Sequence, residues 1–442
     1  MAFIAYFLAR ADVLLYFSIF IALFIYWING IKKSTAKMPP GPMPLPVIGN
    51  LHMVDLNRPH ESLMQLSEKY GEIFTINFGP KKMVVLAGYK IIKEALVMQA
   101  DDFGERAIDP IFKDAFNGHG VVFSNGEQWK SMRRFMLATL RDFGMGKKSQ
   151  EARIQDELIY LIESFRSHNG KLFDTHMLIN SAVSNVICSI IFGKRFEYDD
   201  PTFQKLIKML DENVKLFGTP KVMESTKAQT HFNEENLISS ALDLFIAGTE
   251  TTSTTIRWGI LLMMKYPEIQ KKVQEEIKTH IKPGQLPTVE DRKKMPYTDA
   301  VIHEIQRFGN ILPLNGPRST PTDVYLRGYL IPKDIEVIPL LTSVLYDKTQ
   351  WKTPNDFNPN HFLDENGKFV RHDAFMPFSV GRRACAGESL AKMELFLFFT
   401  GLLQAFTFYP PPGVSKEDLN LKPRVGFTLA PTLYMTYAKP NY

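Results

Sequence analysis

Cys385 lies in a segment whose residue types and spacing could hold a thiolate. It is one of two cysteines and sits in the run Phe378-Ser-Val-Gly381-Arg-Arg383-Ala-Cys385-Ala-Gly387, ahead of an apolar stretch typical of a helix. Glycines let a large flat ligand approach closely, and amides with a nearby guanidinium favour the thiolate. A lone intracellular cysteine is more often a small buried hydrophobic residue, and Cys385 by itself leaves that alternative open. The spacing Phe-x-x-Gly-x-Arg-x-Cys-x-Gly favours a loop beneath a metal or haem.

A second candidate site, Ala247-Gly248-Thr249-Glu250-Thr251-Thr252, lies inside a predicted long helix from about 236 to 265. That helix is apolar on most faces, so we expect it to be buried. Glycine in a helix costs up to about 1 kcal/mol relative to alanine, so this composition suggests contact with a ligand surface. Ala247 and Gly248 would open space, and the acid–alcohol pair Glu250 and Thr251 could relay protons. The alternative is a polar kink in a core helix.

Two shorter spacings place polar groups on one helical face. Glu304 and Arg307 are three residues apart and can form an ion pair; such pairs are usually solvated, but this one lies in an apolar segment. Trp129 and Arg133 lie one turn apart, and both can donate hydrogen bonds to a carboxylate, for which arginine is well suited. The alternative for each arginine is a surface position.

Length and composition exclude several classes of protein. A length of 442 residues suggests about three domains, but no interior linker supports a division, so one large unit is expected. The apolar content of 45% is typical of a globular core, and a net charge of +5 gives no case for nucleic acid. Two cysteines exclude a disulfide framework and suit a reducing compartment. Cys188 lies in an apolar helical pattern and is expected to be structural.

Residues 1–31 predict a membrane anchor. Positions 13–28 are apolar or aromatic except Ser18, slightly fewer than the roughly 17–25 residues of a spanning helix, and residues 29–31 can extend the run. A cleaved signal peptide is the alternative, but no small-x-small cleavage site follows. Positive charge directly after the run predicts that the rest of the chain stays cytoplasmic; it comes from Lys32, Lys33 and Lys37.

Residues 32–50 predict a basic, proline-rich hinge, because five prolines between positions 39 and 46 favour extended polyproline geometry. Ile73–Phe78 with Met83–Leu86, and Val324–Leu326 with Tyr329–Ile331, predict two β-hairpins. Most other stretches show helical periodicity, with proline or glycine at their ends. The expected fold class is mainly α with small β-sheets (α+β).

These motifs, in this order, resemble the cytochrome P-450 superfamily, the haem-thiolate monooxygenases, over nearly the whole chain. The resemblance implies the P-450 fold with a buried haem, Cys385 as the axial ligand of the haem iron, and Glu250 and Thr251 as catalytic residues. It implies further haem contacts from Phe378, Gly381, Gly387, Ala247 and Gly248, and propionate contacts from Trp129, Arg133, Arg383, Arg106 and Arg318. A scaffold below the haem would consist of Glu304, Arg307 and His361, the last in a slot often filled by arginine and not expected to bind metal.

The resemblance also implies a function similar to that of the vertebrate family-two group, which oxidises xenobiotics, fatty acids and steroids. The cofactor would be haem b, and residues 51–442 would form the haem-thiolate catalytic domain. Electrons would come from an NADPH-dependent flavoprotein reductase, and in some cases cytochrome b5, so that one atom of O2 enters a lipophilic small molecule. The chain would be held in the endoplasmic reticulum membrane by its single anchor, in contact with membrane lipid, with the catalytic domain on the cytoplasmic side.

Two surfaces are expected on the same basis. Substrate contacts would come from the largely apolar segments 102–123, 245–251 and 311–314 and from Phe427, which favours lipophilic ligands. A basic cluster near the thiolate would steer an acidic partner, although scattered solvated charges are the alternative. Its members are Lys130, Arg133, Arg134, Arg141, Lys147, Lys148, Arg382 and Lys392.

The stretch between about 217 and 235 is shorter than the family pattern, which places about three helices there. An internal block therefore looks missing after Pro220, which would impair water exclusion over the site and burial of the long helix. The serious alternative function is a catalytically impaired or inactive truncated isoform that is only a membrane-anchored haem-binding protein. Two other functions are alternatives. A haem-thiolate isomerase would be expected to lack the acid–alcohol pair, which this chain has. A cysteine hydrolase would need a histidine, such as His361 or His372, aimed at Cys385.

Overall fold

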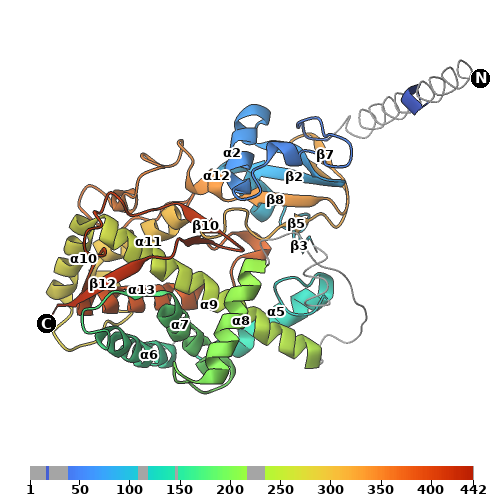
Figure 1. Cartoon of the computed structure of the whole chain (residues 1–442). Coiled ribbons are helices and arrows are strands. Elements are labelled where there is room, and N and C mark those ends of the chain that lie inside the picture. Colours follow the sequence, from blue (N-terminus) through green and yellow to red (C-terminus); the bar gives the residue numbers. More distant parts are fainter. Residues whose placement is uncertain (1–15, 19–37, 108–117, 145–147, 217–233, 442) are drawn as a thin grey trace, which may run out of the picture.

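The computed structural model describes residues 16–18, 38–107, 118–144, 148–216 and 234–441, and helices form most of it. Helices fill one side of the molecule, whereas α2 and the larger sheet occupy the opposite end (Figure 1). The α-helices are α2 (Pro59–Tyr70), α3 (Tyr89–Lys93), α5 (Gly126–Asp142), α6 (Lys148–Arg166), α7 (His176–Ile191), α8 (Pro201–Leu216), α9 (Glu234–Lys265), α10 (Pro267–His280), α11 (Pro296–Gly309), α12 (Thr342–Leu345) and α13 (Glu388–Ala405). Short 3-10 or π turns are η1 (Leu51–Met53), η2 (Glu94–Met98), η3 (Asp291–Lys294), η4 (Pro359–Phe362) and η5 (Gly381–Arg383).

The strands of the described residues form four small sheets. The five-stranded sheet has the order β1-β2-β8-β5-β3, in which only β2 and β8 run parallel. The other sheets are β4-β12-β9, β10-β11 and β6-β7. The strands are β1 (Ile73–Phe78), β2 (Lys81–Ala87), β3 (Glu105–Arg106), β4 (Phe173–Asp174), β5 (Arg318–Ser319), β6 (Val324–Leu326), β7 (Tyr329–Ile331), β8 (Glu336–Leu340), β9 (Phe406–Tyr409), β10 (Pro423–Val425), β11 (Leu429–Pro431) and β12 (Met435–Pro440).

Both predicted hairpins are present. In the first, β1 pairs with β2 in a register that runs from Ile73 opposite Leu86 to Phe78 opposite Lys81. In the second, β6 and β7 join through Arg327 and Gly328, whose φ angles of 46° and 85° suit the tight turns that match strand twist. The predicted class, mainly helical with small sheets, agrees with the structure.

The apolar core lies mainly among α6, α7, α9, α10, α11 and α13. Two smaller clusters cover opposite faces of the larger sheet, because alternate strand residues point to opposite sides. Val84 belongs to one cluster and its neighbour Val85 to the other.

Burial of α9 is less complete than the sequence predicts. From Ile256 onward the helix is enclosed, as expected. Its first turns, however, leave Leu237, Ile238 and Leu242 with 61%, 52% and 43% of their surface exposed. Burial predicted from the apolar pattern alone fails at this end of the helix, where no described element covers the apolar side chains, which agrees with the expected effect of a missing block.

The predicted anchor lies outside the described residues except for 16–18. None of the helices in the described ranges is both long and apolar enough to cross a membrane. The proline-rich segment is described from Met38, where it packs against β1: the Thr75 amide donates to the Pro40 carbonyl at 2.7 Å. This part of the predicted hinge thus lies against the folded body.

Candidate thiolate site

The loop that carries Cys385 is a tight turn between η5 and α13. The Cys385 amide donates to the Phe378 carbonyl at 2.9 Å, and the Ala384 amide donates to the Gly381 carbonyl at 3.1 Å. Gly381 has a φ of 76°, and a Cβ there would overlap the Leu96 carbonyl oxygen. Only glycine meets both conditions, so Gly381 sets the course of the chain into the cysteine.

Two opposing influences act on the Cys385 sulfur. Burial raises the pKa of the thiol, and the charge of Glu388 adds to this effect. Hydrogen bonds from the Gly387 and Glu388 amides and the positive charge of Arg133 lower it, and the net direction is upward. The residue keeps exposed surface, but protein atoms surround the sulfur on most sides and dominate its pKa. A bound metal cation would supply the charge that stabilises the thiolate.

Four guanidinium groups gather beside this loop from four separate segments. Arg106 and Arg318 are paired across β3 and β5, Arg133 comes from α5, and Arg383 from η5. Burial, and then the charges of the neighbouring arginines, lower the pKa of Arg383 to about 8 and that of Arg106 to about 10. The pKa of Arg318 is lowered for the same reasons. The carboxylate that pairs with Arg383 is Glu105, at 3.8 Å. The cluster therefore favours an anionic ligand.

Several donors of this cluster have no hydrogen-bond partner among the described residues. They are Trp129 Nε1, Arg318 Nε and Arg383 Nη1, all buried. Buried donors are nearly always paired, so three such groups in a cluster of four arginines with one nearby carboxylate point to the carboxylates of a bound group. A haem with two propionates beside a cysteine ligand fits this donor set. Arg133, unlike these three donors, is hydrogen-bonded to the cysteine loop: its Nη2 donates to the Ala384 carbonyl at 2.7 Å.

The acid–alcohol pair of α9 has two different surroundings. Glu250 is buried and accepts hydrogen bonds at Oε1 from Thr428 and Thr254, at 2.6 and 3.2 Å. Burial raises its pKa, against the opposing effects of Thr428, Arg257, Thr254 and His176. The Thr251 hydroxyl donates to the Ala247 carbonyl at 2.8 Å on a more open side of the helix.

Gly248 faces α7. A Cβ at this position would lie 2.7 Å from Ile187 Cδ1, so the glycine allows close packing of the two helices. Ala247, one position earlier, is exposed. A packing reason therefore accounts for the glycine.

The predicted scaffold forms a closed network. Arg307 donates from Nε and Nη2 to the two oxygens of Glu304, at 2.8 and 2.7 Å, and neither side chain is exposed. His361 Nδ1 lies 3.2 Å from both Glu304 oxygens. The structure thus joins His361 to the Glu304–Arg307 ion pair.

Sequence reasoning missed four residues that organise the site. Asn125 accepts from Arg383 Nη2 at 2.9 Å, and Asp243 accepts from the Val121 and Val122 amides. Glu394 on α13 accepts from Thr252 on α9 at 3.2 Å, and Thr428 holds Glu250. Glu394 and Asp243 carried a signal, each as an acid flanked by apolar residues in a helical run.

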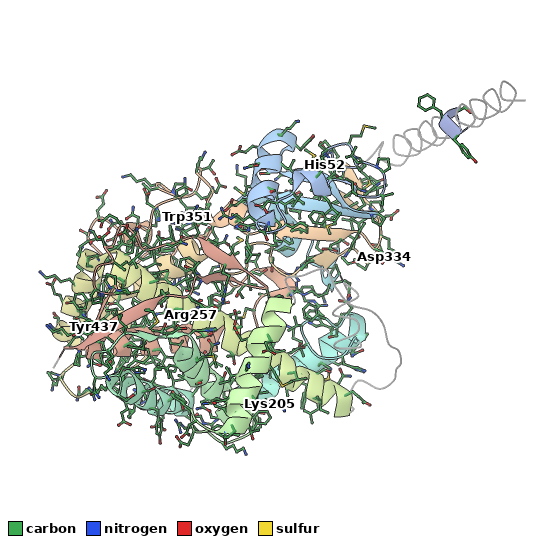
Figure 2. The ribbon with its side chains drawn as sticks, in the orientation of Figure 1. His52, Lys205, Arg257, Asp334, Trp351 and Tyr437 are labelled. Atoms are coloured by element: carbon green, nitrogen blue, oxygen red, sulfur yellow. The ribbon has the colours of Figure 1, made fainter. Side chains whose placement is uncertain are left out.

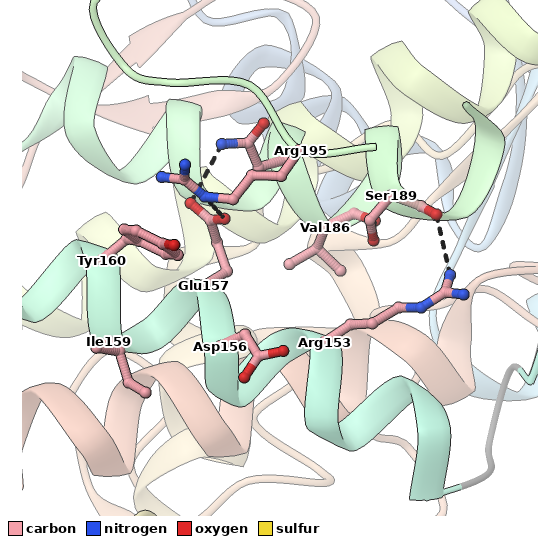
Figure 3. Close-up of a pocket in the computed structure, with 9 residues that line it drawn as sticks. Arg153, Asp156, Glu157, Ile159, Tyr160, Val186, Ser189 and Arg195 are labelled. Carbon is pink, nitrogen blue, oxygen red and sulfur yellow. Dashed lines mark hydrogen bonds and ion pairs between the residues drawn. The ribbon is translucent and has the colours of Figure 1, made fainter. Parts of the chain in front are cut away.

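A groove borders the arginine cluster, and a separate cavity lies among the helices. A groove of about 440 Å³ along α5 is lined by part of the predicted basic cluster, namely Lys130, Arg133, Arg134, Arg141 and Arg382, together with Trp129, Leu137 and Ala138. Lys148 and Lys392 do not line it, and Lys147 lies outside the described residues. A cavity of about 340 Å³ between α6 and α7 is shown in Figure 3, where the Arg195 guanidinium contacts the Glu157 carboxylate and lies over the Tyr160 ring. It holds no cysteine, so it is separate from the thiolate site.

Comparison with known proteins gives a consistent picture. The sequence matches the family profile described as Cytochrome P450 in two segments, residues 39–224 and 219–437. It is 49% identical to Cytochrome P450 2K1 of Oncorhynchus mykiss, with 91% of each chain covered. It is 44% identical to Cytochrome P450 2J2 of Homo sapiens, with 93% of each covered, and 43% identical to Cytochrome P450 2B4 of Oryctolagus cuniculus, with 93% and 96% covered.

The alignments are longer than the chain. Ninety-one per cent of 442 residues is about 402, so about 59 of the 461 positions aligned with the Oncorhynchus mykiss protein have no residue of this chain opposite them. The two profile matches meet at residues 219–224, between α8 and α9.

Proposed function

This chain belongs to the cytochrome P450 family of haem monooxygenases, and on that premise we propose that it inserts one oxygen atom from O2 into a xenobiotic, fatty acid or steroid. The observation that carries the proposal is the set of unpartnered donors on Trp129, Arg318 and Arg383 beside Cys385. Haem b bound there would supply the activation of O2. Cys385 would be the ligand of its iron, and the arginine cluster would hold its propionates.

The other residues of the site then have distinct tasks. Gly381 and Phe378 shape the turn that presents the sulfur, and the Gly387 amide stabilises its negative charge. Glu250 would hold a proton on its buried carboxyl group, and Thr251 would offer a hydroxyl on the more open side of α9. Glu304, Arg307 and His361 fix α11 to the segment around η4, so that the floor of the site stays rigid.

The groove along α5 is the surface that we assign to the electron donor. Its lining has five basic side chains and lies on the helix that also carries Trp129 and Arg133. A flavoprotein reductase or cytochrome b5 with an acidic docking face would be attracted to it. The apolar run at 13–28 and the lysines after it support a single anchor in the endoplasmic reticulum membrane, with this groove on the cytoplasmic side.

A second candidate function is an impaired isoform that binds haem without turnover. The 59 unmatched positions, and the exposed Leu237, Ile238 and Leu242 beside the junction of the two profile matches, support the absence of an internal block. Residues that cover the substrate side exclude water from the reaction. Without them water would enter the site, and electrons would be consumed without oxidation of the substrate.

The reduced, CO-bound difference spectrum of the full chain in detergent tests the first proposal. We expect the red-shifted Soret band of thiolate-ligated haem, its loss in Cys385→Ser, and its retention in the matched control Cys188→Ser. A band typical of histidine-ligated or free haem in the wild-type chain would refute the assignment. If the thiolate band is present, product formed per NADPH consumed with added reductase separates the monooxygenase from the impaired isoform.

A further inference from the structure

The C-terminal β-hairpin reaches the acid of the α9 motif. Thr428, in the turn between β10 and β11, donates its hydroxyl to Glu250 Oε1 at 2.6 Å across 178 positions of sequence. The two residues are 2% and 6% exposed, so the hydrogen bond lies inside the protein. A hydrogen bond is stronger in such surroundings than in water.

The hairpin is itself fixed on both sides of this contact. The Trp258 indole, also on α9, donates to the Leu429 carbonyl at 2.9 Å. The Leu429 amide donates to the Ile311 carbonyl at 2.9 Å. The backbone next to Thr428 is therefore held by two elements, and the position of its hydroxyl is determined by the fold.

Both threonine donors act on the same carboxylate oxygen. Thr254 donates to Oε1 from one turn along α9, at 3.2 Å. Oε2 has no hydrogen bond to any residue in the described ranges. Oε1 can accept from a hydroxyl whether the carboxyl group is charged or neutral, so both hydrogen bonds persist when the group is protonated. Since Oε1 is occupied by these two donors, the arrangement assigns the exchangeable proton to Oε2.

The charged groups that face Glu250 are few. Arg257 lies two turns further along α9, in the interior of the helical region (Figure 2), and His176 faces the carboxylate from α7. Arg257 is 2% exposed, and its Nε has no partner among the described residues. The hairpin contributes a neutral hydroxyl, which orients the carboxyl group and lowers its pKa against the larger effect of burial.

We propose that Thr428 is a positioning residue, which holds Glu250 Oε1 so that Oε2 carries the proton delivered in the oxygenation reaction. The inference rests on the proposed function, because it concerns the proton that Glu250 supplies there. It adds a residue from the distant end of the chain, and it makes the C-terminal hairpin part of proton delivery.

Infrared spectroscopy of the full chain in detergent reads the Glu250 proton directly. The carboxylic C=O band of Glu250 is assigned as the band that Glu250→Gln removes. Thr428→Val keeps the shape of the side chain but removes the donor, so we expect the pH at which this band disappears to rise by about one unit. Thr428→Ser should restore the wild-type value. Thr436→Val, a buried threonine on β12 bonded to Met264 and Tyr409, is the matched control and should change nothing.

Thr254→Val supplies a second variant if Thr428→Val fails to fold, with a smaller shift expected in the same direction because its hydrogen bond is longer. Turnover gives the functional readout: Thr428→Val should keep the thiolate spectrum but form about tenfold less product per NADPH consumed, with rescue by serine. An unshifted Glu250 band in Thr428→Val, or unchanged product yield despite a shifted band, would overturn the inference. The band is independent of the CO spectrum, so failure of the proposed function is distinguished from failure of this inference.

Discussion

Arg383 lies over the indole of Trp129, with the guanidinium carbon 3.7 Å from the ring centroid, and each side chain keeps a buried N–H without a partner. The contact joins η5, two residues before the cysteine, to α5. Stacking fixes both donors in one place while leaving them available to a ligand. The propionate assignment of these residues can therefore be tested by changing the donors one at a time.

Trp129→Phe removes the indole donor and keeps an aromatic ring under Arg383. We expect weaker retention of haem, by about tenfold in the dissociation constant, since a hydrogen bond to a charged group contributes about 1.5–3 kcal/mol. Transfer of haem to apomyoglobin measures the change. Trp351→Phe is the control, because that indole donates to the Val344 carbonyl away from the cluster. Equal haem loss in both variants would contradict the assignment.

Arg307→Leu should destabilise the fold by about 3–5 kcal/mol, because it leaves the Glu304 carboxylate buried without its ion-pair partner. Denaturant unfolding gives the free energy. Lys293→Ala is the control: its ion pair with Glu290 is largely exposed, so its loss should cost less than about 1 kcal/mol. A cost for Arg307→Leu as small as that of the control would show that the network does not hold α11.

Glu394 predicts a pH dependence of stability. Burial raises its pKa in the folded chain to about 8, against the opposing hydrogen bond from Thr252. Between the unfolded pKa of about 4.5 and that value the folded state binds more protons, so its stability falls as pH rises, by up to about 1.4 kcal/mol per unit. Glu394→Gln should flatten this slope between pH 5 and 8 in denaturant unfolding, whereas the exposed Glu365→Gln should leave it unchanged. If the slope of stability against pH persists in Glu394→Gln, groups other than Glu394 cause it.

Gly381→Ala should abolish the thiolate spectrum, because the new methyl group would overlap the Leu96 carbonyl in a backbone conformation that already disfavours alanine. Gly413 has a similar φ of 82° but open space around it. Gly413→Ala should cost only about 1 kcal/mol and keep the spectrum. If both variants bind haem equally well, the close approach at Gly381 is not what shapes the loop.

Local pattern was enough to predict several features of this protein. The β1–β2 and β6–β7 hairpins follow from alternating apolar residues around turn residues. The Glu304–Arg307 pair follows from helical spacing, and the cysteine loop from its glycines. In each case the interacting groups are close in sequence, so short-range geometry determines how they meet.

Tertiary structure alone decided which distant groups share a site. Arg106, Trp129, Arg318 and Arg383 come from separate segments, and no local pattern shows that the four side chains converge or that three of them keep an unpaired buried donor. The Thr428–Glu250 bond spans 178 positions and arises because the hairpin packs on α9. The exposure of the apolar side chains at the start of α9 likewise depends on whether another element covers them, and helical periodicity alone does not predict this. Contacts between distant segments follow from how whole elements pack, and packing is a property of the folded chain.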